Sequence, residues 1–112
     1  MKPTRLFDIP RNQVLTNSQD HFIGGKHLEG HTYAYSTKEF MDLANQVSLG
    51  LLQMGVKPGD KIALISYNNR PEWNVLDIGM QQIGAINVPV YPTISPKDYI
   101  YIFNDASVKY CF

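Results

Sequence analysis

Residues 61–91, KIALISYNNRPEWNVLDIGMQQIGAINVPVY, decide the fold, because two apolar runs enclose a segment with helical periodicity. Residues 61–67 form a short and nearly continuous apolar run, which is typical of a strand covered on both faces. Pro71 is suited to the first turn of a helix, with Asn69 or Arg70 as its cap. The apolar residues that follow share one helical face: Trp73, Leu76, Met80 and Ile83. The stretch therefore predicts a strand, a helix and a second strand.

The second strand, residues 85–91, begins after Gly84, which ends the helix. Pro89 lies inside this strand and has no N–H to donate, so it indicates an edge strand or a bulge. A connection through a helix is too long for a hairpin, and we therefore expect the two strands to run parallel.

The segments on either side also begin helices with recognisable caps. Ser36 and Glu39 form a capping box before residues 37–54, where apolar residues recur in steps of three and four. Ser95 and Pro96 mark the start of another helix. Short apolar segments precede the helix at 37–54 and follow the helix that starts at Ser95 and Pro96. Together with the two strands and the helix within residues 61–91, they give the expected order β-α-β-α-β-α-β.

This order predicts an α/β fold with a mostly parallel sheet of about four strands and helices packed on it. The first strand is expected in residues 32–36, TYAYS. Residues 1–31 are rich in turn-forming residues, with the glycines concentrated in a hairpin or loop at 21–31. We expect an irregular N-terminal arm over residues 1–31 and a partial α/β domain over residues 32–112.

The composition suits one soluble domain with a modest core. The chain has 112 residues, 44% of them hydrophobic, and equal numbers of basic and acidic residues. This balance argues against nucleic acid as a main partner, since phosphate binding needs a basic surface. Residues 1–20 lack the apolar core of a signal peptide, and no stretch approaches the roughly 18 apolar residues of a membrane helix. We expect a cytoplasmic protein.

Known phosphate-binding loops are absent from the sequence. Two stretches of the form G-x-x-x-x-G start at Gly50 and Gly79, but Val56 and Ala85 stand where a P-loop needs lysine. Both stretches also fall in predicted helices. Nucleotide binding through a P-loop is therefore not expected.

Other reactive side chains have simpler interpretations. Three histidines could contribute to a metal site, but the glycines around them favour a flexible hairpin that carries them on its surface: His21, His27 and His31. The single cysteine, Cys111, excludes an internal disulfide and is expected to be a buried, inert thiol in a strand. Asp77 is expected to face solvent or to cap a neighbouring element.

Two polar loops follow predicted strands: NNRPEW, residues 68–73, and YPTISP, residues 91–96. Both could lie at the carboxyl edge of the sheet, where open α/β folds bind ligands, and Arg70 could pair with a carboxylate or a phosphate. Each loop is also explained as the start of a helix, and this structural interpretation is favoured.

Four segments together resemble the AMP-forming acyl-CoA synthetases of the adenylate-forming family. YSTKEF at 35–40 is similar to the first core motif, and residues 84–93, from Gly-Ala to Tyr-Pro-Thr, are similar to the second. GDKIALISYNNRPEW at 59–73 resembles the segment between them. TRLFDIP at 4–10 resembles the arm of the long-chain fatty-acid branch. The resemblance implies the N-terminal part of such an enzyme.

The resemblance also implies a two-step reaction that uses ATP, Mg²⁺ and coenzyme A. A carboxylate attacks the α-phosphate of ATP, and the thiol of coenzyme A then displaces AMP. The family's phosphate loop, its adenine and ribose motifs and its lysine-bearing C-terminal lid do not occur in this sequence. We therefore assign no catalytic, cofactor-binding or metal-binding residue, and we expect none of these cofactors to bind this segment.

The first hypothesis is the N-terminal segment of a long-chain fatty-acid–CoA ligase, inactive by itself, with a fatty acid as substrate of the full-length enzyme. The alternative is a stand-alone, non-catalytic α/β module that binds a partner or itself through uncovered apolar surface. A small flavodoxin-like ligand-binding domain is a third and less favoured hypothesis.

Overall fold

The computed structural model describes residue 2 and residues 4–67 and 69–112. Asn68, the first residue of the NNRPEW loop, lies outside the described residues. The elements along the chain are α1 (Asp8–Thr16), β1 (Ile23–Lys26), β2 (Thr32–Tyr35), α2 (Thr37–Gln53), β3 (Lys61–Ile65), α3 (Pro71–Gln82), β4 (Ile86–Val90), α4 (Pro96–Asp105) and β5 (Tyr110–Cys111).

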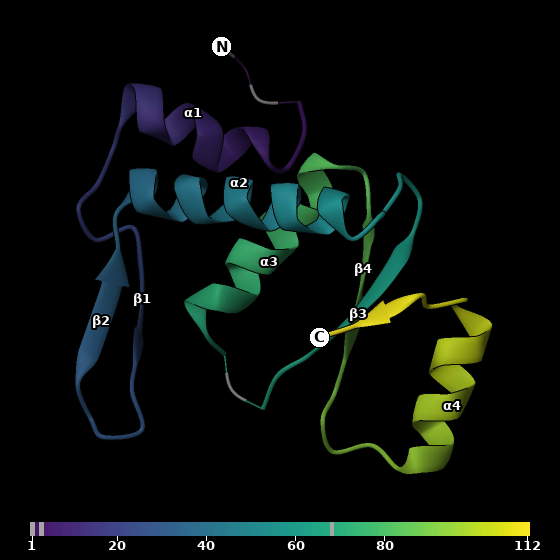
Figure 1. Cartoon of the computed structure of the whole chain (residues 1–112). Coiled ribbons are helices and arrows are strands. Elements are labelled where there is room, and N and C mark those ends of the chain that lie inside the picture. The colour runs from purple at the N-terminus through teal and green to yellow at the C-terminus, as the bar shows by residue number, and fades with distance from the viewer. Residues whose placement is uncertain (1, 3, 68) are drawn as a thin grey trace.

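A parallel sheet with the strand order β4-β3-β5 confirms the α/β class (Figure 1). Lys61 lies opposite Ile86 at the start of the β3–β4 pair, and Ile62 lies opposite Tyr110 in the β3–β5 pair. β4 is an edge strand, as Pro89 predicted, because an edge needs no N–H donor on its open side. β3 is central, and Ile62 and Ala63 within it are fully buried.

The strand predicted in residues 32–36 forms, but its expected place in the parallel sheet is wrong. β2 pairs antiparallel with β1 in a separate two-stranded hairpin. Residues 27–31 connect them, and Gly30 turns the chain with a φ of 95°. A connection this short permits only antiparallel pairing. Within the described ranges the parallel sheet therefore has three strands, not about four.

Two apolar clusters hold α2 and α3 together and fix α3 on the sheet. The first lies between the two helices and contains Phe40, Met41, Ala44, Val75 and Ile78. The second joins the ends of both helices to β3 and contains Leu51, Val56, Ile62, Met80 and Ala85. Ser48 is buried in the same interface, where its hydroxyl donates to the Gly79 carbonyl at 2.7 Å.

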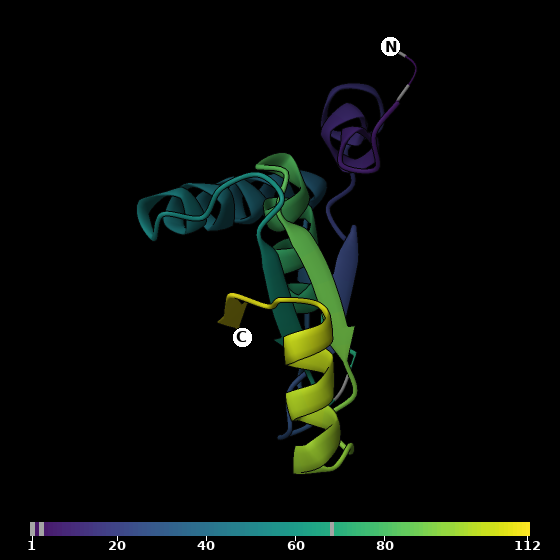
Figure 2. The same ribbon diagram turned by 90° about the vertical axis from the view of Figure 1, so that its right-hand side faces the viewer.

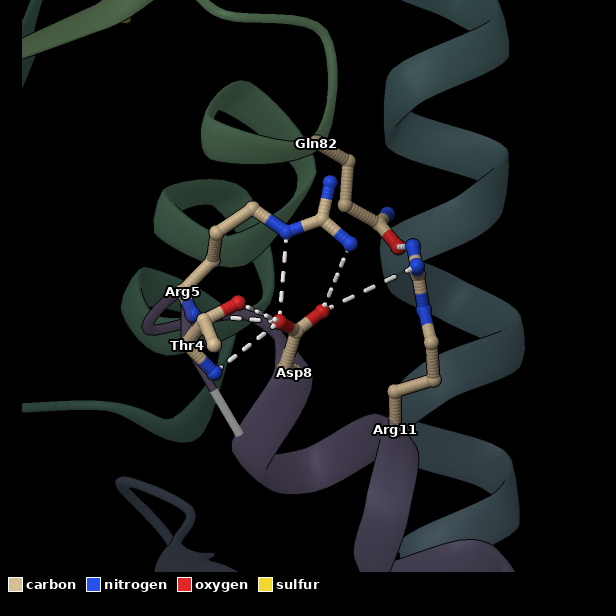
Figure 3. A network of polar contacts seen from close by, with 5 residues as sticks. All are labelled: Thr4, Arg5, Asp8, Arg11 and Gln82. Atoms are coloured by element: carbon tan, nitrogen blue, oxygen red, sulfur yellow. Dashed lines mark hydrogen bonds and ion pairs between the residues drawn. The ribbon is translucent and has the colours of Figure 1, made fainter. Parts of the chain in front are cut away.

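The N-terminal arm contains a regular element, α1, which lies beside α2 in Figure 1. Thr4 and Arg5, which precede this helix, lie around the buried carboxylate of Asp8 (Figure 3). That carboxylate accepts hydrogen bonds from the Arg5 N–H at 3.0 Å, from the Arg5 guanidinium and from Thr4. Arg11, one turn further on, donates to Gln82 Oε1 at 2.9 Å and so ties α1 to the end of α3.

Electrostatics explain why the buried Asp8 stays charged. The pKa of Asp8 is lowered from 3.8 to about 2, and the largest cause is the hydrogen bond from the Arg5 side chain. The backbone N–H groups of Arg5 and Thr4 act in the same direction, and together these hydrogen bonds outweigh the opposing effect of burial. The Arg5 and Arg11 guanidinium carbons lie 4.5 Å and 5.1 Å from the Phe7 ring centroid, so cation–π contacts add to the network.

The helix α4 lies on the opposite side of β3 and β4 from α3 (Figure 1, Figure 2). None of its residues is buried. In the part of the chain that the structure describes, no helix has the length and apolar character to cross a membrane.

Candidate functional site

The candidate site is the carboxyl edge of the parallel sheet, where β3 and β4 end side by side. Residues 66, 67, 69 and 70 follow β3 and residues 91–95 follow β4, so the described parts of both polar loops lie at this edge. One cavity opens between the hairpin and the loop after β3, and a second opens between the loops after β3 and β4. Ser66 and Asn69 contribute to the walls of both.

The larger cavity has a volume of about 750 Å³ and lies between the β1–β2 hairpin and the end of β3. Polar and aromatic side chains line it, among them Lys26, His27, Tyr33, Tyr67 and Arg70. The smaller cavity has a volume of about 350 Å³ and more apolar walls, formed by Leu64, Trp73, Pro89, Val90, Tyr91 and Pro92 among others. Each cavity is a concave opening at the edge where α/β folds bind ligands.

A polar network of Tyr33, Arg70 and Glu72 joins the hairpin to the start of α3. The Tyr33 hydroxyl lies 2.8 Å and 3.0 Å from the two carboxylate oxygens of Glu72, and Arg70 donates to the same carboxylate at 2.7 Å. Gly25 makes this approach possible, because a Cβ there would lie 2.8 Å from the Tyr33 hydroxyl oxygen. The hairpin therefore carries the tyrosine that orients Glu72.

The hydrogen bonds of this network shift the pKa values of all three side chains. Burial alone would raise the pKa of Glu72, but the hydrogen bonds from Tyr33 and Arg70 lower it. Burial raises the pKa of the Tyr33 hydroxyl, and its hydrogen bond to Glu72 acts in the same direction. The bond to Glu72 also raises the pKa of Arg70. Arg70 is thus a cation already paired with a carboxylate.

Both polar loops also begin helices, as the sequence predicts. Arg70 is the N-cap residue of α3, with Pro71 in the first helical position and no side-chain capping bond. At α4 the Ser95 hydroxyl accepts a hydrogen bond from the Asp98 N–H at 3.3 Å. Helix initiation therefore explains Pro71 and Ser95, while the same loops supply walls to the two cavities.

Two other sequence predictions are wrong. Asp77 was expected to face solvent or to cap an element, but it is half-buried and accepts hydrogen bonds from the side-chain amides of Gln81 at 3.0 Å and Asn87 at 2.9 Å, so it joins α3 to β4. The prediction of a buried Cys111 is wrong, because this residue is exposed. It lies in a two-residue strand at the edge of the sheet, where one side has no neighbour to cover it.

The histidines lie on the surface, as expected. His27 and His31 flank the turn of the hairpin, where the His27 N–H donates to the His31 carbonyl at 2.8 Å. Among the described residues no three histidine, cysteine, aspartate or glutamate side chains lie close enough to hold a metal ion. The assignment of no catalytic, cofactor-binding or metal-binding residue stays a prediction.

A parallel sheet with helices packed on it and cavities at its carboxyl edge defines an α/β fold of the open-sheet type. Residues 13–112 match the family model described as "AMP-binding enzyme". The chain belongs to this family, and the expected membership of the adenylate-forming ligases is confirmed.

Individual relatives agree with this assignment. The chain is 34% identical over 74 residues to the long-chain-fatty-acid–CoA ligase FadD15 of Mycobacterium bovis, which covers 63% of this chain and 12% of that one. It is 31% identical over 80 residues to Rv1549, an uncharacterised protein of Mycobacterium tuberculosis; the match covers 71% of this chain and 45% of Rv1549. The crystal structure of IdnL1 shares the fold with a TM-score of 0.84 at 18% identity, over 98% of this chain and 22% of that one. The chain thus spans about an eighth of the length of FadD15.

Proposed function

We propose that this chain supplies the N-terminal part of a long-chain fatty-acid–CoA ligase, which joins a fatty acid to coenzyme A at the expense of ATP, with Mg²⁺. The observation that carries the proposal is the family match over residues 13–112, together with the identity to FadD15. The similarity to the long-chain branch in residues 4–10 supports the choice of substrate class.

We also propose that residues 1–112 do not catalyse adenylation by themselves. Transfer of an adenylyl group needs donors placed where negative charge develops on the phosphates. At the candidate site Arg70 is already paired with Glu72 at 2.7 Å, and the family's phosphate loop does not occur in the sequence. Binding of ATP, Mg²⁺ and coenzyme A is accordingly expected from residues beyond this chain.

In this proposal the carboxyl edge of the sheet is a scaffold. The Tyr33–Glu72 bond fixes the hairpin against α3, and the two loops present cavity walls to the remainder of the enzyme. The division into an arm at 1–31 and a partial domain at 32–112 stays a prediction, as does the cytoplasmic location.

Exchange of radioactive pyrophosphate into ATP, measured with and without a long-chain fatty acid, tests both parts of the proposal. Purified residues 1–112 should show no exchange that depends on the fatty acid, while FadD15 serves as the positive control. A chimera in which this chain replaces the matched stretch of FadD15 should exchange pyrophosphate. Exchange by the chain alone would contradict the proposed inactivity, and a folded but inactive chimera would contradict the proposed ligase role.

A second candidate function is a stand-alone module that associates with itself or with another protein. It is favoured by the exposed apolar residues of α4. The similarity to Rv1549 also favours it, because the chain covers 45% of that protein but only 12% of FadD15. Light scattering over a hundredfold range of concentration tests it. A monomer at every concentration would argue against self-association, and the balanced charge predicts no binding to nucleic acid in the same samples.

A further inference from the structure

A chain of hydrogen bonds connects the N-terminal arm to the crossing of α2 and α3, and every donor in it points the same way. Arg11 donates to the side-chain oxygen of Gln82 at 2.9 Å (Figure 3). The side-chain nitrogen of Gln82 donates to the Ser48 hydroxyl at 3.0 Å, and that hydroxyl donates to the Gly79 carbonyl at 2.7 Å. Bonds in such a chain polarise and strengthen one another. We name these four residues the donor relay.

The buried carboxylate of Asp8 anchors the relay in the arm. Asp8 is 3% exposed, and its Oδ1 lies 3.0 Å from the guanidinium of Arg5 and 4.0 Å from that of Arg11. A buried charge that loses its partners is strongly destabilising, so this carboxylate holds both arginines in place. Arg11 can donate only to an oxygen, and it therefore keeps the amide of Gln82 with its nitrogen toward Ser48. The arm thus sets the orientation of a side chain at the helix crossing.

Apolar contacts hold α1 only weakly. Leu6, Ile9 and Leu15 are 58%, 46% and 82% exposed. Phe7 and Val14 are half-buried against the first apolar cluster, whereas α2 contributes buried side chains to both clusters. An element with few buried apolar contacts opens at a lower free energy than the core. The attachment of the arm therefore depends largely on its polar network.

We propose that residues 4–16 form a strap, which opens as a unit and which, when closed, fixes the crossing of α2 and α3 through the donor relay. When the strap opens, the sheet and the β1–β2 hairpin stay folded. The Tyr33–Glu72 bond then still holds the other end of α3. The inference is independent of the ligase role, because it involves no ligand and neither of the two cavities.

Limited digestion with trypsin, which cleaves after lysine and arginine, measures this opening. The bond after Arg11 lies inside α1, and the bond after Lys61 lies in the central strand β3. Cleavage after Arg11 should not depend on urea below the unfolding transition, whereas cleavage after Lys61 should rise steeply with urea. Trp73 is the only tryptophan in the sequence, and its fluorescence should keep the native value during the first cut.

Two variants open the strap by different routes. Asp8→Asn removes the charge that Arg5 and Arg11 share, and it should speed cleavage after Arg11 about tenfold or more. Gln82→Met interrupts the relay with little change in size, and it should speed the same cleavage several-fold. Asp20→Asn is the matched control, because Asp20 is exposed, and it should leave the rate unchanged.

A double-mutant cycle tests the relay itself. Ser48→Ala and Gln82→Met remove adjacent members, so their effects on the thermal midpoint should depart from additivity by about 2 °C or more. The double variant should be about as stable as the less stable single variant. Ser48→Ala combined with Tyr33→Phe, which acts at the other end of α3, should be additive.

The proposal is overturned if neither variant of the strap is cut faster than the control. It is also overturned if cleavage after Arg11 and cleavage after Lys61 have the same urea dependence, because the arm would then open only together with the whole chain. An additive cycle for Ser48 and Gln82 would overturn the relay. If Asp8→Asn does not fold, the cleavage rate of Gln82→Met decides.

Discussion

The crossing of α2 and α3 at Gly79 leaves no room for a larger side chain. A Cβ at this position would lie 2.5 Å from Cγ1 of Val47, 2.7 Å from its Cβ and 3.0 Å from the Ala44 carbonyl oxygen. Val47 is β-branched and has one strongly preferred rotamer in a helix, so it cannot turn aside. Gly79→Ala must therefore push the two helices apart and strain the 2.7 Å hydrogen bond from Ser48 to the Gly79 carbonyl.

The expected loss of stability follows from two opposing effects. Overpacking a well-packed interface costs about 1–3 kcal/mol, and contact with a backbone oxygen places this case near the upper value. Replacing glycine by alanine within a helix contributes about 1 kcal/mol in the opposite direction. The net loss is about 2 kcal/mol, which corresponds to a fall of roughly 8 °C in the thermal midpoint of a domain of this size.

Gly50→Ala is the matched control, because Gly50 lies within α2 and a Cβ there meets nothing within 4 Å. It should raise stability by up to about 1 kcal/mol through helix propensity alone. Thermal and urea unfolding of both variants, followed by circular dichroism, give the comparison. If Gly79→Ala is as stable as the wild-type chain, the close helix contact does not exist in solution and the reasoning fails.

Three further substitutions test individual contacts. Asp8→Asn should destabilise the chain at pH 7. Because the pKa of Asp8 is lowered to about 2, the stability difference between the wild-type chain and the variant should shrink as the pH falls from about 4 to 2. Urea unfolding at both ends of this range would show a constant difference if the carboxylate had no role. Ser48→Ala should cost about 1–2 kcal/mol, because the buried Gly79 carbonyl loses its donor; an unchanged urea midpoint would count against that bond. Tyr33→Phe should raise the pKa of Glu72, since a hydrogen bond to the carboxylate is removed; an NMR titration that gives the same pKa in both proteins would refute the contact.

The elements with local signals were predictable from the sequence. The capping box of Ser36 and Glu39 forms with both of its hydrogen bonds, at 2.9 Å and 3.1 Å, and the helix that follows ends one residue before its predicted limit. Pro89 correctly indicated an edge strand. These features depend on neighbouring residues, so a periodic pattern or a cap is sufficient to recognise them.

The features that depend on distant residues were not predictable. The Tyr33–Glu72 bond joins residues 39 positions apart, and neither residue has a local signal for the other. The buried position of Asp8 had no capping signal to mark it, because α1 begins without a side-chain capping bond. The periodicity of residues 32–36 indicated a strand but could not show which strand would pair with it.

The exposed Cys111 has a practical consequence for anyone who handles this protein. It is the only sulfhydryl group in the sequence, and it sits at the open rim of β5. A maleimide dye attached there would place a single reporter on the molecule without mutagenesis. In an oxidising buffer two molecules can become linked through the same atom, and such a covalent pair would mimic genuine self-association unless a reductant is present.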